Sequence, residues 1–232
     1  PWKRLVCHNF RTNLHVDAML EYDPALPVYV GIDPGGVVYA IEFVQFTADG
    51  EVHVLDEIYV HRWTHQDVIN EYHARTLSVV TEGGAIDVAS KQPQNAMPIS
   101  FEEWYKDTGL VLWAQKHAVD DTVDKLCWAL SPNPNTGRPR LRVRPHCTGV
   151  ISEMGGCPSP VPEGGPWMRY EYRDGIGPPM RKNDHACKAL GYVMMGPYGL
   201  QAYERAVESA GPVSYLDGDR GDSASYLRRG RG

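Results

Sequence analysis

The sequence contains no run of apolar residues long enough to cross a membrane. Such a span needs roughly 18 apolar residues in succession. The opening segment, PWKRLVCHNF, also lacks the apolar core of a secretory signal peptide. Both absences predict an intracellular protein that is neither secreted nor held in a membrane.

Cysteine is scarce and forms no recognisable pattern. The five cysteines contain no C-x-x-C pair and stand at Cys7, Cys127, Cys147, Cys157 and Cys187. This odd-numbered set signals neither a disulfide framework nor a zinc ribbon, so we expect reduced thiols. No internal repeat is evident.

Positive charge is in deficit. With 23 Lys and Arg against 29 Asp and Glu, the formal net charge is −6. This balance argues against a protein that coats nucleic acid through bulk electrostatic attraction, although it leaves room for a local basic groove.

The chain does have enough apolar content for a core. Its 232 residues are 42% hydrophobic and 22% charged, which is typical of one globular domain. Composition divides it into a linker or N-terminal extension over residues 1–27, a domain over residues 28–210, and a tail over residues 211–232. The tail is rich in Gly, Asp, Ser and Arg, so we expect it to be disordered.

The segment VYVGIDPGG at residues 28–36 organises the prediction. Its β-branched and aromatic residues favour a buried strand, which Pro34 and the following glycines end abruptly. Asp33 therefore lies at the tip of that strand. Because an isolated buried charge is costly, Asp33 either holds a cation, lies in an open cleft, or hydrogen-bonds the backbone of its own turn.

A hairpin and a helix follow this strand. Strands are expected at residues 37–46 and 52–60, joined by a turn containing Asp-Gly, and a capping box then begins a helix at residue 64. A fourth strand within residues 77–86 ends at Asp87. A second carboxylate is thus expected at a strand end.

The second half of the chain is predicted to alternate short helices and strands. Helices are expected over residues 100–107 and 118–130, and a further helix begins at Asn183 as its N-cap. Asp184 then falls in the first turn of that helix. Residues 147–180 are rich in Gly and Pro and predict a long loop or a small hairpin flap.

The strand RLRVR at residues 140–144 has an alternating pattern. Its period of two puts Arg140 and Arg142 on one face. Two interpretations remain open, because such a stripe either protects a sheet edge by its charge or contacts phosphate groups.

Asp33, Asp87 and Asp184 lie where strands end or a helix begins, and such positions can meet at one edge of a mixed sheet. Three clustered carboxylates need cations, because neighbouring negative charges raise one another's pKa. Oxygen ligands favour Mg²⁺ or Mn²⁺ over zinc. Two such ions about 3.5–4 Å apart can activate water and stabilise the leaving oxygen of a phosphodiester.

The order of these motifs resembles a known family. GIDPG after an apolar strand, the hairpin, the capped helix, RPRLRVRPHC and the closing KNDHACKALGYV are similar to the C-terminal nuclease domain of the large terminase subunit of tailed bacteriophages. The resemblance covers residues 27–195. KNDHA is its most specific piece, whereas GIDPG recurs in other ribonuclease H-like proteins.

The resemblance implies an α/β fold of the ribonuclease H-like type, a mixed β-sheet flanked by helices. It implies that Asp33, Asp87 and Asp184 are catalytic residues and ligands of two divalent cations, Mg²⁺ or Mn²⁺. The implied activity is endonucleolytic cleavage of double-stranded DNA during viral genome packaging, in the cytoplasm of the host cell.

The implied partners are double-stranded DNA, an ATPase motor domain N-terminal to the nuclease in the same chain, the portal protein and the small terminase subunit. The G-x-x-x-x-G-K-[ST] loop of such a motor does not occur in this sequence.

The sequence departs from the family pattern D-H-A-x-D-A-L-R-Y, because Lys188 and Gly191 stand in the last helix. An auxiliary carboxylate in its second turn is therefore missing. His185 either orients a ligand, contacts phosphate, or is a helix-terminal histidine whose hydrogen bonds are satisfied within the protein. Arg181 and Lys182 are the preferred phosphate contacts.

Three other functions share parts of this pattern. A Holliday-junction resolvase or a related ribonuclease H-like nuclease has the same acids but acts on branched DNA or RNA hybrids. A sugar-kinase or actin-like ATPase needs a duplicated domain and a second phosphate loop, which the sequence does not show. A non-catalytic packaging module keeps the fold without needing converging acids.

Overall fold

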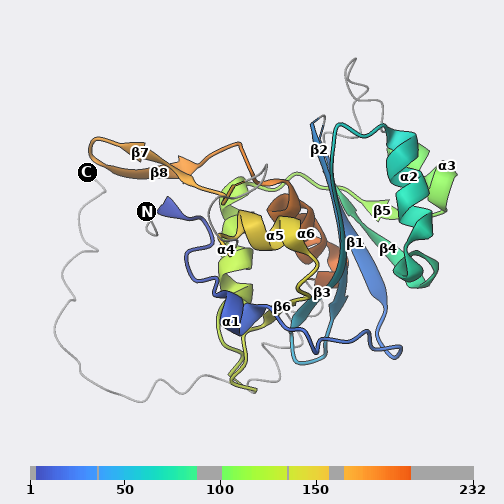
Figure 1. Ribbon diagram of the computed structural model, residues 1–232, viewed down its shortest axis with the longest axis horizontal. Helices are drawn as coiled ribbons and strands as arrows, with labels where there is room; N and C mark the ends of the chain where they lie inside the picture. The colour runs from blue at the N-terminus through green and yellow to red at the C-terminus, as the bar shows by residue number, and fades with distance from the viewer. Residues whose placement is uncertain (1–3, 36, 88–100, 135, 157–164, 200–232) are drawn as a thin grey trace, which may run out of the picture.

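The computed structural model describes residues 4–35, 37–87, 101–134, 136–156 and 165–199 (Figure 1). The predicted tail over residues 211–232 lies outside these ranges. Within them, no helix is long and apolar enough to cross a membrane.

A mixed six-stranded sheet forms the centre of the domain, in the order β5-β4-β1-β2-β3-β6. The strands are β1 (Val28–Pro34), β2 (Val38–Phe46), β3 (Val52–His61), β4 (Thr81–Ile86), β5 (Leu112–Trp113) and β6 (Leu141–Val143). β1, β2 and β3 form an antiparallel meander, whereas β4 and β6 run parallel to β1 and β3. The predicted hairpin and the mixed sheet are confirmed.

Helices cover both faces of this sheet (Figure 1). They are α1 (Thr12–His15), α2 (His65–Ala74), α3 (Phe101–Thr108), α4 (Val119–Ala129), α5 (Thr148–Glu153) and α6 (His185–Met195), and a 3₁₀ helix, η2 (Thr76–Val80), precedes β4. α2 and α3 lie on one side, and α4, α5 and α6 lie on the other. Each side has its own hydrophobic core.

Helix α6 lies directly on β1 because glycine lets the two backbones meet. A Cβ atom at Gly31 would be only 1.9 Å from the carbonyl oxygen of Ala189. On the other side of α6, a Cβ at Gly191 would be 2.2 Å from Thr122 of α4. Any larger side chain at these positions would push α6 away from the sheet or from α4.

The segment before β1, predicted to be a linker or an extension, packs into the domain over its described residues. Leu5, Val6 and Phe10 are buried. The Val6 N–H donates to the Trp167 carbonyl at 3.0 Å, and Val16 forms a bridge with Val143 of β6. This segment therefore contributes to the core on the α5 side.

The region at residues 147–180, predicted to be a loop or a flap, contains more structure than its Gly and Pro content indicates. The predicted small hairpin is present as β7 (Arg169–Tyr172) and β8 (Gly175–Pro179). Helix α5 was missed, because its six residues are too few to show a helical period.

Two facing glutamates are buried in the centre of the sheet. Glu42 of β2 pairs in register with Glu57 of β3. The Glu57 carboxylate accepts hydrogen bonds from the N–H groups of Gly149 and Val150 at 2.7 and 2.6 Å. Burial, followed by the charge of Glu57, raises the pKa of Glu42 well above its ordinary value, which favours the protonated form of Glu42.

Replacing Glu42 by Gln should therefore change how stability depends on pH. Because the pKa of Glu42 is higher in the folded state, its contribution to stability is full below the unfolded pKa and is lost as pH rises towards the folded pKa. Gln stays neutral, so Glu42→Gln should be at least as stable as the wild type at about pH 8 and should lose less stability between about pH 5 and pH 8. Urea unfolding at both pH values measures this.

The exposed Glu82 offers a matched control. Glu82→Gln should keep the pH dependence of the wild type. A Glu42→Gln protein that is clearly less stable at the higher pH would show that the Glu42 carboxyl is ionised and stabilising.

Candidate functional site

Asp33 lies at the end of β1 with only 6% of its surface exposed. Its Oδ2 is 2.7 Å from Nδ1 of His185, a residue 152 positions later in the chain. A Cβ at Gly35 would be 3.1 Å from the His185 ring, so a glycine in the turn lets this ring approach. The Asp33 carboxylate thus contacts α6, which is far away in the sequence.

Asp87 lies beside Asp33, at the end of the neighbouring strand β4. Ile32 of β1 pairs with Ile86 of the parallel strand β4, so the next residue of each strand is an aspartate. Paired residues on neighbouring strands point to the same face, about 4.8 Å apart. Tyr192 of α6 lies near Asp87, as shown by the pKa of Tyr192, which burial and then the charges of Asp33 and Asp87 raise.

Asp184 opens α6 and is 3% exposed. The sequence prediction that Asn183 is the N-cap was wrong by one residue, because Asn183 takes a left-handed conformation with φ 55° and Asp184 is the N-cap. The Asp184 side chain does not cap the helix. Its Oδ2 instead lies 2.8 Å from Nζ of Lys188, one turn later.

Residues 184, 188 and 192 follow the four-residue spacing of one helix face, and this face meets the ends of β1 and β4. Burial, followed by the negative charges of Asp33, Asp87 and Asp184, raises the pKa of Tyr192. The structure therefore brings the three predicted acids together around one face of α6.

Lys188, together with His185 when it is protonated, offsets these acids. Burial raises the pKa of Asp33 and the charge of Asp87 adds to this, while the bond from His185 opposes it. Burial lowers the pKa of Lys188, but its bond to Asp184 and the charges of Asp33 and Asp87 outweigh burial, so the pKa lies above its ordinary value. Burial also lowers the pKa of His185, but its bond to Asp33 and the charge of Asp33 outweigh burial, so the pKa is raised.

The acids fit a divalent cation by their chemistry, because carboxylate oxygens are the ligands that Mg²⁺ and Mn²⁺ prefer. Their described geometry is not that of a formed metal site: in the part of the chain that the structure describes, no group of three or more His, Cys, Asp and Glu side chains is placed to hold a metal ion. Lys188 contacts the Asp184 oxygen that a cation would use. A cation that bound at this oxygen would displace the ammonium group.

The predicted phosphate contacts fall at two separate places. Arg181 and Lys182 are exposed and directly precede the site. Arg142 pairs in register with His53, whereas the level of Asp33 on β3 is Tyr59, six residues further along, or about 20 Å. The structure therefore does not bring Arg140 and Arg142 together with the acids.

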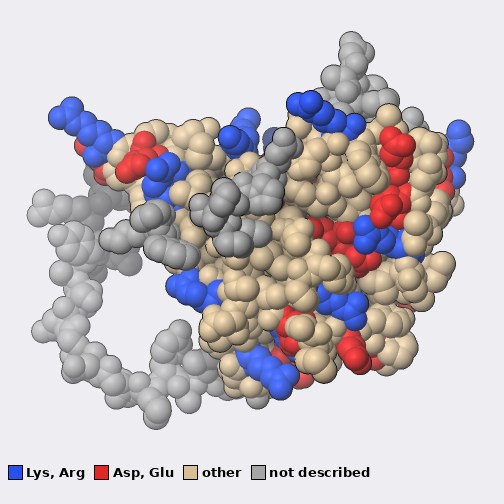
Figure 2. All heavy atoms as spheres, in the orientation of Figure 1, with Lys and Arg blue, Asp and Glu red and all other residues tan. Residues whose placement is uncertain are grey.

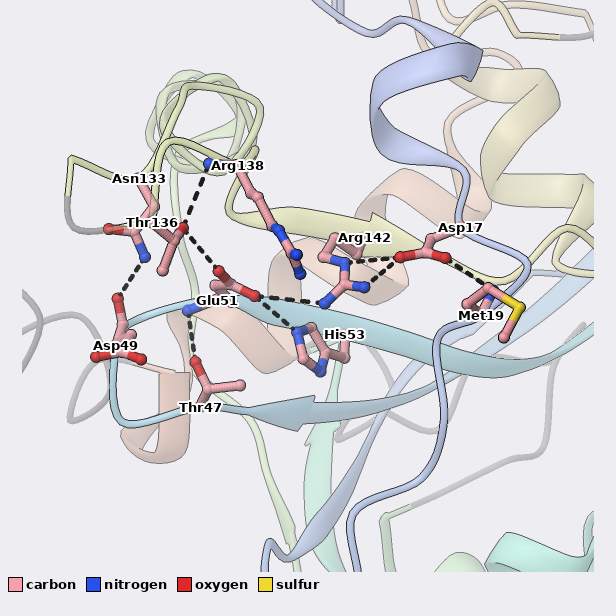
Figure 3. Close-up of polar contacts among 10 residues, drawn as sticks. All are labelled: Asp17, Met19, Thr47, Asp49, Glu51, His53, Asn133, Thr136, Arg138 and Arg142. Atoms are coloured by element: carbon pink, nitrogen blue, oxygen red, sulfur yellow. Dashed lines mark hydrogen bonds and ion pairs between the residues drawn. The ribbon is translucent and has the colours of Figure 1, made fainter.

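Arg140 and Arg142 make contacts within the protein. Arg142 binds Asp17 of the N-terminal segment and lies 3.7 Å from Glu51, the residue before β3 (Figure 3). Arg140 stacks on Trp128 and donates to the Pro132 carbonyl at 2.8 Å. These contacts support the sheet-edge interpretation of the stripe.

Lys and Arg side chains form separate small groups on the face shown in Figure 2, rather than one continuous basic surface. This agrees with the net charge of −6. DNA would therefore meet only a few cations on this face.

Sequence reasoning missed three contributors to the site. The spacing of Asp184, Lys188 and Tyr192 could have revealed two of them, since it places all three on one helix face. Glu153 accepts hydrogen bonds at the start of α6, yet it lies in a segment predicted to be a loop, and its sequence neighbours carry no signal.

No protein-family profile and no curated protein matches the chain. Solved structures do. The large terminase of a thermophilic bacteriophage matches with a TM-score of 0.58 and 16% identity, covering 82% of this chain and 45% of the terminase. The chain therefore spans less than half the length of that protein.

Two structures of separate nuclease domains match over nearly their whole length. The large terminase nuclease domain of bacteriophage SPP1 with bound Mn has a TM-score of 0.54 and 12% identity, covering 78% of this chain and 95% of the domain. The large terminase nuclease of a second thermophilic phage, G20c, with bound magnesium has a TM-score of 0.53 and 12% identity, covering 83% of this chain and 97% of the nuclease. The predicted ribonuclease H-like fold, shared with large terminase nuclease domains, is confirmed.

Replacing Lys188 by Met should expose the competition between its ammonium group and a cation. Without divalent cations, Asp184 loses its partner, which should cost about 1.5–3 kcal/mol of unfolding free energy. With Mn²⁺, the increase in melting temperature should be larger than for the wild type, because the cation no longer displaces a lysine. Thermal unfolding with and without Mn²⁺ measures both effects, and an equal Mn²⁺ response would show that Lys188 and the cation do not compete.

Proposed function

We propose that this chain, which has the fold of a large terminase nuclease domain, is a metal-dependent endonuclease that cleaves double-stranded DNA during viral genome packaging. The observation that carries the proposal is that Asp33 and Asp87 follow paired residues of β1 and β4, while the charges of both and of Asp184 act on the same buried Tyr192. A structural role needs no such convergence, and three clustered acids are costly unless they bind something positive.

Each residue of the site has a proposed role. Asp33, Asp87 and Asp184 hold the divalent cations, Mg²⁺ or Mn²⁺, with two ions as the expected number. When bound, such ions lower the pKa of water and neutralise charge on the leaving oxygen. His185 orients the Asp33 carboxylate through its bond at 2.7 Å.

Lys188 has a separate proposed role. It balances the charge of Asp184 until a cation enters, since its ammonium group lies 2.8 Å from the Asp184 oxygen. The ammonium group thus offsets one of the three negative charges while no cation is bound.

The wider assembly is part of the proposal. We expect the nuclease domain to extend over residues 28–210, with residues 4–27 packed against it, and to act in the host-cell cytoplasm beside an ATPase motor domain. The portal protein and the small terminase subunit are the further expected partners.

A non-catalytic packaging module is the second candidate. The contact between Lys188 and Asp184 favours it, because the lysine already supplies the positive charge that the acids need. Cation dependence separates the two functions.

Asp87→Asn provides the direct test of catalysis. The amide keeps the size of the side chain, but it removes one negative charge from the cation site. Plasmid cleavage in Mg²⁺ or Mn²⁺ should nearly disappear, while the melting temperature without metal stays the same or rises. Wild-type cleavage should need Mg²⁺ or Mn²⁺ and fail in Ca²⁺, whose looser coordination misplaces the attacking water.

Two results would contradict this account. Undiminished cleavage by the wild type in EDTA would exclude a metal-dependent reaction. Cleavage by Asp87→Asn at the wild-type rate, with an unchanged Mn²⁺ response, would remove Asp87 from the site.

DNA binding should depend on the positively charged side chains of Arg181 and Lys182, which precede the acid site. The double charge reversal of Arg181 and Lys182 to Glu should weaken binding of a linear duplex and reduce the slope of log affinity against log salt by about 1 for each phosphate that the protein no longer neutralises. The matched control reverses Arg138 and Lys106, which are exposed elsewhere on the protein. Both variants change the net charge equally, so equal salt slopes would show that Arg181 and Lys182 make no specific contact.

A further inference from the structure

We propose that Glu153 of α5 is a positioning residue that caps helix α6 in place of Asp184, and so leaves the Asp184 carboxylate available to the acid site. This inference rests on the proposed function for its consequence, but the capping itself is a property of the fold. Glu153 is fully buried.

The Glu153 carboxylate receives hydrogen bonds from the first turn of α6. Its Oε1 accepts from the His185 N–H at 3.0 Å, and its Oε2 accepts from the Cys187 N–H at 2.8 Å. These are among the N–H groups that have no partner within a helix. Glu153 therefore performs the task that an N-cap side chain normally performs.

Asp184 occupies the N-cap position but does not act as the cap. Aspartate is one of the preferred N-cap residues because its carboxylate can accept from the second or third N–H of the helix. Here the Asp184 side chain makes no such bond and lies with Lys188 instead. Without Glu153, the unpaired N–H groups of α6 would compete for the Asp184 carboxylate and draw it out of the acid site.

Hydrogen bonds fix both Glu153 and the helix α5 that carries it. The Tyr59 hydroxyl of β3 donates to its Oε1 at 3.0 Å. The Trp167 N–H donates to its backbone carbonyl at 2.6 Å. At the other end of α5, Glu57 of β3 binds two N–H groups, so the helix is tied to the sheet at both ends. Capping by Glu153 therefore sets the position of α6 relative to β3.

The test compares the wild type with Glu153→Gln and Glu153→Asp. Gln keeps the size of the side chain but replaces one acceptor oxygen by an NH₂ group, which faces an N–H donor. Asp keeps the charge but is one methylene shorter. Thr64→Ala is the matched control, because it removes the side-chain cap of α2 on the opposite face of the sheet.

Two measurements are made on each protein: hydrogen exchange of the first-turn amides of α6, and Mn²⁺ binding by calorimetry. Glu153→Gln should lose protection at residues 185–187 and bind Mn²⁺ about 10–100-fold more weakly, as is typical when a residue that orients a metal ligand is removed. Glu153→Asp should show the same changes to a smaller extent. Thr64→Ala should lose protection in α2 and keep the Mn²⁺ affinity of the wild type.

Each outcome has one meaning. Wild-type exchange at residues 185–187 in Glu153→Gln would overturn the capping role. Reduced protection with unchanged Mn²⁺ affinity would overturn the positioning of Asp184. If the wild type itself binds no Mn²⁺, the proposed function fails, and the exchange data still decide whether Glu153 caps α6. If Glu153→Gln does not fold, Glu153→Asp supplies both measurements.

Discussion

The close contact between α6 and β1 is the constraint on which the rest of the site depends. At Gly31 the strand has no side chain, and the Ala189 carbonyl of α6 occupies the space that a Cβ would fill. Because the helix lies this close, its N-terminus reaches the end of β1, where Asp33 lies. The strand ends are then faced by four residues of this helix region: Asp184, His185, Lys188 and Tyr192.

Charge balance is the second constraint, and it follows from the first. Packing α6 on β1 brings three acids into a partly buried space, which would be unfavourable without positive charge. Lys188 supplies positive charge from the same helix that brings Asp184, and His185 adds to it when it is protonated. A divalent cation would enter a site that already has its own counter-charges. We therefore expect its affinity to reflect competition with Lys188 as well as the number of carboxylates.

The sequence predicted the elements whose signals are local. The apolar strand ending at Asp33, the Asp-Gly hairpin and the capping box at Thr64 each depend on a few neighbouring residues, and the structure has all three. Asp33 and Asp87 could be placed at strand ends for the same reason. Those positions grouped the three acids, and the family resemblance then implied that they are metal ligands in a ribonuclease H-like fold.

The parts that could not be predicted depend on contacts between distant segments. Glu153 reaches α6 from a helix of six residues inside a Gly- and Pro-rich region, and nothing in its neighbourhood indicates a cap for another helix. Arg142 could not be assigned to Asp17 because the two are 125 residues apart. Likewise, a pattern of alternating arginines cannot tell a sheet edge from a DNA contact until the register of the edge strand is known.

The central claim is that Asp33, Asp87 and Asp184 together form a site for a divalent cation. A crystal structure of the protein soaked in Mn²⁺, with the metal located by its anomalous scattering, tests this most directly. The account predicts Mn²⁺ at about 2.1 Å from carboxylate oxygens of these three residues, with the Lys188 ammonium group moved away from Asp184. Crystals that show no Mn²⁺ at this edge of the sheet at saturating concentration, with Lys188 still bound to Asp184, would contradict it.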